Sequence, residues 1–356
     1  MHKFHTTFEL RSKILTFGFP QKNLGNHSLI RIFEFHSKIG CISEIKINIH
    51  LFCISLNLHY LCSGMIEYIR LLRPLQWLKN MFVFAPIFFS NNLLKPEFFW
   101  PTLVVFASFC LVSSSIYCFN DLRDVEADRL HPKKCHRPIA SGKVSIKGGY
   151  VMMILSMTGA LALIPIAQSP NTPFLYGIVV GYWLMNLAYC IRLKQIAILD
   201  VSIIAIGFVM RVLAGGLTTD IWISHWLVMM TFLVTLFLAF TKRNDDYRIY
   251  EQTGTKPRVS ITGYNKTFIN EATAIIASVT LVCYIMYTMS PEVIQRMGTR
   301  YVYLTSAWVL LGLLRYLQNM IVYGLSGSPT KSLVKDHFVQ FCLLGWIASF
   351  FVIIYL

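Results

Sequence analysis

The feature that most constrains this chain is a series of long apolar runs. A transmembrane helix needs about 20 mostly apolar residues, and runs of that kind lie near 77–94, 99–119, 149–168, 173–191, 196–217, 222–241, 268–289, 301–323 and 337–356. Only 14% of the 356 residues are charged, against about 25% in an ordinary soluble domain. The sequence therefore predicts an all-α fold, a polytopic membrane bundle of about nine transmembrane helices. It excludes a soluble enzyme and a disordered chain.

The charges between these runs alternate along the chain. Lys and Arg gather before the first run and in 120–148, 192–195, 242–267 and 324–336, while the other connecting segments carry few. Because Lys and Arg accumulate on the cytoplasmic side, we expect a multi-pass protein of the cytoplasmic (inner) membrane with its N-terminus inside, its C-terminus outside and an active site facing the cytoplasm. The net charge of +15 then reflects the membrane surface, and we expect no nucleic-acid partner.

Residues 1–64 stand apart from these runs. Their one long apolar stretch, 47–62, is interrupted by His50 and His59 and is too short to span a bilayer. We expect 1–64 to be a non-structural extension, or one translated from a start upstream of Met65 that the cell does not use. The alternative is a short amphipathic anchor on the membrane surface. The membrane domain is then 65–356.

The most informative segment follows the second run. It contains one amide and three carboxylates: Asn120, Asp121, Asp124 and Asp128. At about 100° per residue all four fall within one sector of a helix. Mg²⁺ prefers oxygen ligands and is usually bound by one or two carboxylates together with substrate phosphates. The pattern predicts a magnesium site that binds a diphosphate. The alternative is a solvated helical turn beyond the membrane, or acids that Arg123 and Arg129 neutralise.

Basic residues follow this segment and recur in the other polar segments. Lys and Arg bind phosphate groups, Arg in a bidentate manner, so cations beside the acids predict a polyanionic substrate. The candidates are Lys79, Lys134, Arg137, Lys194, Arg211, Lys242 and Arg243. Arg211 has a structural alternative, an ion pair with Asp200.

These residues resemble the UbiA superfamily of intramembrane prenyltransferases over about 65–356. The superfamily's first motif, NDxxDxxxD, is matched in full by the four residues of the acidic segment. Three further segments resemble its decaprenyl-phosphate phosphoribosyltransferase branch: Arg73-Pro74 with Trp77 and Lys79-Asn80, then His131 to Gly142, and Leu199-Asp200 with Arg211 to Gly216. The second motif departs from the Asp-Arg-x-Asp-Asp of the aromatic prenyltransferases, because Lys242 replaces its first acid. The branch ends this motif in Glu, at the place of Asp246, which leaves the role of Asp245 open.

The resemblance implies a UbiA-like fold and a Mg²⁺-dependent transferase. The enzyme would move 5-phosphoribosyl from phosphoribosyl diphosphate to a polyprenyl phosphate, for lipid-linked pentose and cell-envelope glycan synthesis. Asp121, Asp124 and Asp128 would be catalytic and would hold Mg²⁺ with Asn120, while Asn120 and Asp246 would join the basic candidates around the substrate. Two alternatives remain: an aromatic prenyltransferase of quinone biosynthesis, and an anion transporter. Chain length of the lipid and oligomeric state stay open.

Overall fold

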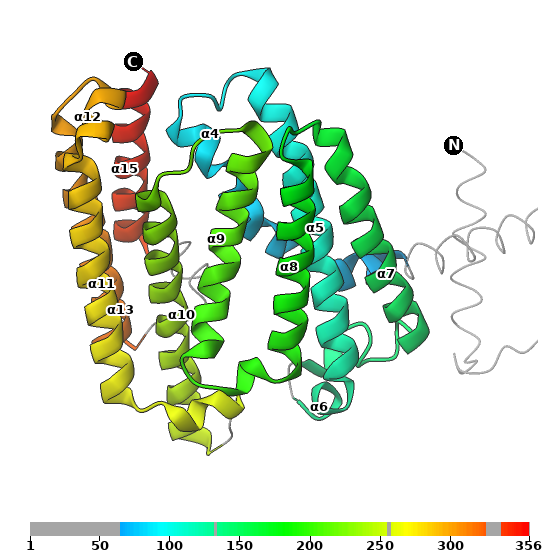
Figure 1. Ribbon diagram of the computed structural model, residues 1–356. Coiled ribbons are helices and arrows are strands. Elements are labelled where there is room, and N and C mark those ends of the chain that lie inside the picture. The colour runs from blue at the N-terminus through cyan, green and yellow to red at the C-terminus, as the bar shows by residue number, and fades with distance from the viewer. Residues whose placement is uncertain (1–64, 132–133, 255–257, 325–335, 356) are drawn as a thin grey trace, which may run out of the picture. The chain divides into compact units, whose positions relative to one another are not determined.

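Every element in the described part of the chain is a helix (Figure 1). The computed structural model describes residues 65–355 except 132–133, 255–257 and 325–335. The expected extension 1–64 lies outside the described residues, so its nature and its boundary remain predictions. In chain order the elements are helix 65–72, η1 Pro74–Phe84, α4 Ala85–Phe89, α5 Pro96–Arg123, α6 Val125–Leu130, η2 Lys134–His136, α7 Ile146–Leu163, η3 Ile164–Ala167, α8 Thr172–Ile191, η4 Leu193–Gln195, α9 Leu199–Thr219, α10 His225–Thr253, η5 Val259–Gly263, α11 Lys266–Met289, α12 Pro291–Met297, η6 Tyr301–Thr305, α13 Ser306–Ile321 and α15 His337–Tyr355.

Six of these helices are long and apolar enough to cross a membrane: α5, α7 with η3, α8, α9, α10 and α11. The expected all-α membrane bundle is therefore confirmed, and the chain is a multi-pass membrane protein. The expected count of nine spans is not confirmed. The first run folds as the 3₁₀ helix η1 followed by the short α4, and the run 301–323 divides into η6 and the 16-residue α13.

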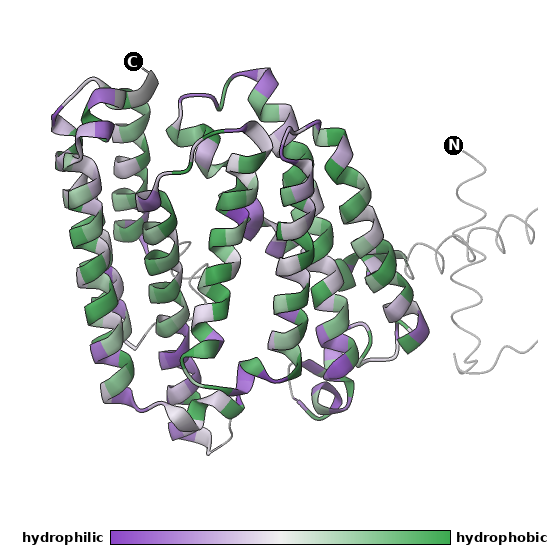
Figure 2. Ribbon diagram, in the orientation of Figure 1, coloured by the Kyte–Doolittle hydropathy of each residue, from purple (hydrophilic) through white to green (hydrophobic). Residues whose placement is uncertain are grey.

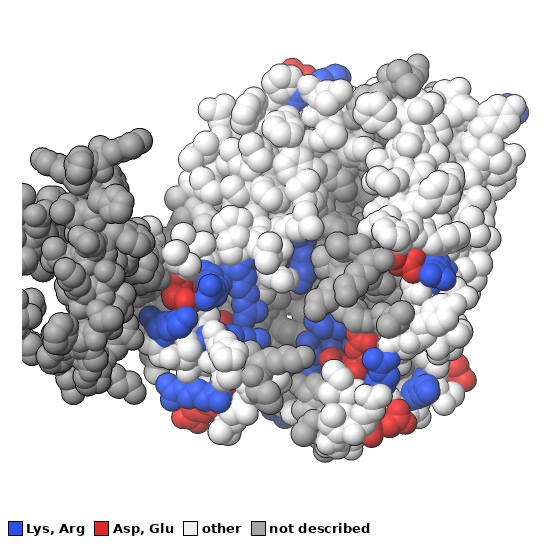
Figure 3. Space-filling view, turned by 180° about the vertical axis from the view of Figure 1, so that it is seen from behind, with Lys and Arg blue, Asp and Glu red and all other residues white. Residues whose placement is uncertain are grey.

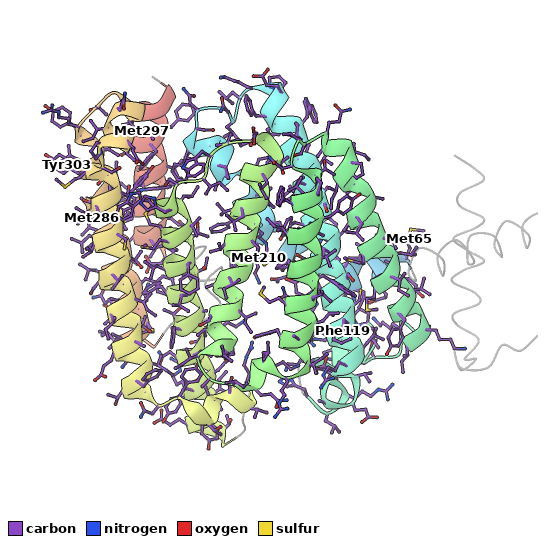
Figure 4. All side chains as sticks on the ribbon, in the orientation of Figure 1. Met65, Phe119, Met210, Met286, Met297 and Tyr303 are labelled. Carbon is purple, nitrogen blue, oxygen red and sulfur yellow. The ribbon has the colours of Figure 1, made fainter. Side chains whose placement is uncertain are left out.

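Hydrophobic residues predominate along the long helices (Figure 2), and many of their large apolar side chains are exposed on the outside of the bundle. Three examples, exposed by more than half, are Leu155, Ile275 and Phe341. In Figure 4, Met286 and Tyr303 lie at an outer edge, whereas Met210 and Phe119 lie among α5, α8 and α9, where both pack against a buried core cluster. Such an apolar exterior is stable in lipid, where the backbone hydrogen bonds are satisfied inside each helix.

The two ends of the bundle differ in charge. At one end lie α6, η2, η4 and η5, with the polar segments between the long helices, and we call this the charged end (the lower end in Figure 1). The other end contains α4, η3, α12 and η6. Figure 3 shows Lys, Arg, Asp and Glu gathered over the lower half of one face, around a hollow, while the upper half carries few.

The 3₁₀ helix η1 runs from the charged end into the bundle between α5 and α9. The Trp77 indole donates a hydrogen bond to the Ser114 hydroxyl (3.0 Å) on α5. On the α9 side, Gly215 allows close approach, because a Cβ there would clash with the carbonyl oxygen of Val83. This packing buries Asn80 between the helices, while the neighbouring Lys79 side chain stays exposed.

Candidate active site at the charged end

The first acidic segment, 120–128, bends at its centre. We expected one continuous helix, but α5 ends at Arg123, Asp124 caps it, and α6 begins at Val125. Asp121 thus lies on α5 and Asp128 on α6. The prediction of a single helical face is wrong in this respect, although the bend still brings Asp121 and Asp128 to the same guanidinium group.

Two arginines neutralise these acids. Arg137 Nη1 contacts Asp121 Oδ1 at 3.1 Å and Asp128 Oδ2 at 2.6 Å, and Arg73 Nη2 contacts the same Asp121 oxygen at 2.5 Å. The Arg137 side chain is 25% exposed, whereas that of Asp121 is 2% exposed. The acids are therefore buried beneath cations that remain accessible from the charged end.

The centre of the segment has a different partner. Asp124 accepts hydrogen bonds from the Lys194 ammonium of η4 at 2.9 and 3.1 Å. Asn120 Oδ1 is contacted by the Cys190 thiol at 3.6 Å. The expected alternative, neutralisation by Arg123 and Arg129, is wrong, because these two residues donate to backbone carbonyls of Ile191 and Ala140.

The second motif forms a buried ion-pair network. Arg243 Nε contacts Asp200 Oδ2 at 2.8 Å, and both side chains are 0% exposed. Arg243 Nη1 also donates to Asp246 Oδ2 (2.7 Å), which is contacted in turn by Arg258 Nε (3.0 Å). Asp200 therefore pairs with Arg243, so the alternative of a structural pair between Arg211 and Asp200 is wrong. The structure also places the Arg243 guanidinium out of reach of a substrate at the surface.

Arg211 is buried on α9 among neutral partners. Its Nε donates to Asn80 Oδ1 (2.8 Å), one Nη to the carbonyl of Gly207 (2.7 Å), and the other to the Tyr182 hydroxyl (2.7 Å). Within the described residues it makes no ion pair. A buried guanidinium whose charge is not neutralised is a favourable position for a bound anion.

Three further cations make no ion pair with any described residue: Lys79, Lys134 and Lys242. Lys79 and Lys242 keep exposed side chains even though their neighbours Asn80 and Arg243 are buried. Burial lowers the pKa of the Lys134 ammonium, and the nearby charge of Arg137 lowers it further. Cations that lack acidic partners are available for phosphate groups.

The first acidic segment has the ligand chemistry of a magnesium site in part. Asp121 Oδ2 is buried and has no hydrogen-bond partner among the described residues. Asp121 and Asp128 converge on one nitrogen of Arg137, and Mg²⁺ commonly takes one or two carboxylates when substrate phosphates supply its other ligands. Asp124 turns to Lys194 instead, and in the described ranges no three His, Cys, Asp or Glu side chains form one group able to hold a metal ion.

Sequence reasoning missed the partners of the acids. Arg73 lies 48 residues before Asp121, and only its place in the Arg-Pro motif marked it. Tyr264 and Ser260, which hydrogen-bond Asp200 at 2.6 and 3.0 Å, lie in a different polar segment. No spacing in the sequence indicates such contacts between distant segments.

Comparison with known proteins gives a consistent picture. Residues 81–328 match the model of the UbiA prenyltransferase family. A decaprenyl-phosphate phosphoribosyltransferase from Mycolicibacterium smegmatis is 33% identical, over 83% of this chain and 93% of that protein. One from Mycobacterium tuberculosis is 30% identical, over 79% of this chain and 92% of that protein.

A similar fold occurs in a solved structure. The structure of a UbiA homolog from Archaeoglobus fulgidus bound to GPP and Mg²⁺ superposes with a TM-score of 0.62, at 19% identity, over 82% of this chain and 100% of that one. At this level of identity the likeness shows the fold, and it confirms the expected UbiA-like architecture.

Proposed function

The chain belongs to the UbiA prenyltransferase family, and we infer that it is a transferase that moves the 5-phosphoribosyl group of phosphoribosyl diphosphate to a polyprenyl phosphate. The identity to decaprenyl-phosphate phosphoribosyltransferases extends over most of both chains. One observation supports the assignment of this function to the charged end: an acidic segment lies at the same end of the bundle as several cations that lack acidic partners among the described residues. Two anionic substrates require such a surplus of positive charge.

The reaction needs no side-chain nucleophile. The bond from ribose C1 to the diphosphate oxygen breaks, the diphosphate leaves with the electron pair, and an oxygen of the lipid phosphate bonds to C1. A phosphate monoester carries about −1.5 to −2 charge near neutral pH, so the attacking oxygen is already ionised and no general base is required. The chain's contribution is to position the two anions and to stabilise the charge that moves between them.

We propose that Mg²⁺ binds at the first acidic segment together with the diphosphate. Asp121 and Asp128 would hold it, with Asp124 and Asn120 close by. When bound, the ion neutralises the departing diphosphate. In this proposal the same carboxylates would also stabilise the positive charge that develops on the ribose ring.

The cations divide between the two substrates in this proposal. Arg73, Arg137 and Lys194 already lie on the acids, so they are placed for the diphosphate that joins them. Arg211 is buried on α9, whereas Lys79 on η1 and Lys242 on α10 are exposed, and in this proposal the three would bind the 5-phosphate and the lipid phosphate. Asp246 acts through its pairs with Arg243 and Arg258.

The lipid tail would follow the apolar part of the bundle. Three residues beyond Lys79, Phe82 begins the lining of an apolar cavity of about 260 Å³, which continues through Pro86, Trp222 and Trp346 towards the opposite end. If the phosphate head group of the lipid binds near Lys79, its tail could therefore extend along the apolar side chains that line this cavity. By the distribution of Lys and Arg, the charged end would face the cytoplasm, where phosphoribosyl diphosphate is dissolved.

The function is tested by giving the purified protein each pair of substrates in separate reactions. With labelled phosphoribosyl diphosphate and polyprenyl phosphate we expect a labelled lipid that depends on Mg²⁺. With labelled allylic diphosphate and an aromatic acid we expect none. The reverse result would assign an aromatic prenyltransferase, and flux of an anion into proteoliposomes without any transfer product would assign a transporter.

A further inference from the structure

A tyrosine hydroxyl from one polar segment holds the start of α9. Tyr264 Oη donates to Asp200 Oδ1 (2.6 Å) and accepts from the backbone N–H of Ile198 (2.7 Å). Burial raises the pKa of Tyr264, and its hydrogen bond to Asp200 raises it further, so the hydroxyl is a donor at neutral pH. Tyr264 is 5% exposed and Asp200 is 0% exposed, which keeps both away from a substrate.

The segment that Tyr264 holds is strained. Ile198, the residue before α9, has φ 69° and ψ −48°, and a β-branched residue at positive φ is a genuine outlier. Such conformations persist only where the surrounding structure determines them. The residue before Tyr264, Gly263, packs directly on this turn, since a Cβ on it would lie 2.7 Å from that of Ala197.

The strained turn is continuous with the helix that carries Lys194. The N–H of Ile196 bonds to the carbonyl of Leu193 (3.2 Å), and the N–H of Asp200 bonds to that of Ile196 (3.1 Å). Lys194 lies on η4, four residues before Ile198, and its ammonium binds Asp124. A change in the backbone at Ile198 would therefore displace the Lys194 ammonium from the first acidic segment.

The second connection runs through Asp200. Its Oδ2 contacts Arg243 (2.8 Å) and accepts from Ser260 (3.0 Å). Arg243 then holds Asp246, and Asp246 contacts Arg258, whose side chain is 31% exposed at the charged end. The buried acid thus fixes the position of an accessible cation through two intermediate residues.

We propose that Tyr264 and Asp200 are positioning residues for phosphoribosyl diphosphate: they hold Lys194 on the first acidic segment and Arg258 on the second motif. This role rests on the proposed function, because that function supplies the substrate, phosphoribosyl diphosphate, whose phosphates Lys194 and Arg258 would bind. Neither Tyr264 nor Asp200 touches that substrate. Their effect is on the placement of charge at both sides of the charged end.

The test compares Tyr264→Phe with Tyr316→Phe in the full-length purified protein. Both tyrosines are 5% exposed and belong to one core cluster, but among the described residues the Tyr316 hydroxyl interacts with Thr241 and contacts neither Asp200 nor the start of α9. KM for each substrate, kcat and the melting temperature are measured for both variants. For Tyr264→Phe we expect KM for phosphoribosyl diphosphate to rise about tenfold, as the loss of two buried hydrogen bonds allows. We expect kcat and KM for polyprenyl phosphate to change less than about twofold.

A second variant tests the strained turn itself. Glycine adopts positive φ without steric cost, so Ile198→Gly should relieve the need for the Tyr264 hydroxyl. The Ile198 side chain is 53% exposed, and its removal opens no buried cavity. We expect the double variant Tyr264→Phe/Ile198→Gly to recover at least about threefold in KM for phosphoribosyl diphosphate relative to Tyr264→Phe.

Three outcomes would overturn the proposal. Tyr264→Phe could match Tyr316→Phe in every parameter, it could lower kcat and raise both KM values in parallel with a fall in melting temperature, or the double variant could recover nothing. Failure of the proposed function is a separate result, since the wild-type protein would then form no phosphoribosyl lipid. In that case the two tyrosine variants are compared by the rise in melting temperature that inorganic diphosphate and Mg²⁺ produce in each. An equal rise in Tyr264→Phe and Tyr316→Phe would reject the positioning role.

Discussion

The two acidic segments at the charged end use similar residues in different ways. In the first, 120–128, buried aspartates lie beneath arginines that are about a quarter exposed, and Asp121 Oδ2 has no partner among the described residues. In the second, Arg243 is wholly buried between Asp200 and Asp246. Charges that can exchange partners suit a binding site, whereas charges that are wholly buried in ion pairs maintain a shape. The first segment is thus the better candidate for chemistry and the second for positioning.

The largest effect should come from breaking the buried pair on one side only. Arg243→Met leaves Asp200 buried without its cation, and removal of one partner of a buried pair costs about 3–5 kcal/mol. We expect a large fall in melting temperature. It is measured with a thiol-reactive dye, which reports the exposure of the buried Cys110, Cys118 and Cys190 on unfolding. Arg137→Met, in the more exposed cluster, should lower activity with a much smaller change in melting temperature. Equal stability losses in the two variants would remove the distinction between the segments.

The next effect concerns catalysis at the first segment. Asp121→Asn removes a buried charge from the proposed diphosphate and Mg²⁺ site, and we expect kcat to fall by about 10²–10³-fold, the scale of a lost electrostatic contact in the transition state. Asp220→Asn is the matched control, because Asp220 is exposed at the opposite end and Asn tolerates its left-handed backbone (φ 53°). Wild-type turnover in Asp121→Asn would show that the site has been misplaced.

A smaller effect should separate the two substrates. Charge reversal in Lys242→Glu should raise KM for phosphoribosyl diphosphate by about 10- to 100-fold, in line with about 1.5–3 kcal/mol for a hydrogen bond to a charged group. KM for polyprenyl phosphate should change far less. Lys266→Glu, an exposed lysine at the same end, serves as the control and should change neither value appreciably. A selective loss of lipid affinity in Lys242→Glu would exchange the assigned phosphates.

The smallest effect tests the packing of η1 against α9. Gly215→Ala would push α9 against the Val83 carbonyl, and forced repacking of this kind costs about 1–3 kcal/mol. We expect a lower melting temperature and reduced activity. Gly177→Ala is the control, since a Cβ at Gly177 meets nothing within 4 Å, and it should be neutral or slightly stabilising. Similar behaviour of the two variants would mean that η1 is free to shift.

The sequence predicted the long helices well because apolar runs of about 20 residues have one stable form in lipid. The expected run 173–191, for example, corresponds to α8, Thr172–Ile191. The first run was harder to predict, because η1 lies between α5 and α9 as a 3₁₀ helix, and tertiary packing decides its form.

The sequence supplies the candidate residues of the site, whose roles remain a prediction, but it does not indicate the contacts between them. The order of Asn120, Asp121, Asp124 and Asp128 marked the chemistry, since few other roles place three carboxylates beside a membrane span. Which cation meets which acid depends on segments that fold together from distant positions. Arg243 illustrates this, because its motif suggested a phosphate ligand while its burial makes it a partner of Asp200.

The most direct measurement of the central claim is the transfer reaction with purified protein, labelled phosphoribosyl diphosphate and polyprenyl phosphate, with and without a chelator of divalent cations. We predict a labelled lipid-linked phosphoribose that forms with Mg²⁺, disappears with the chelator and is reduced about 10²–10³-fold in Asp121→Asn. A labelled product that forms equally well in the chelator and in Asp121→Asn would contradict the assignment of the first acidic segment as the catalytic site.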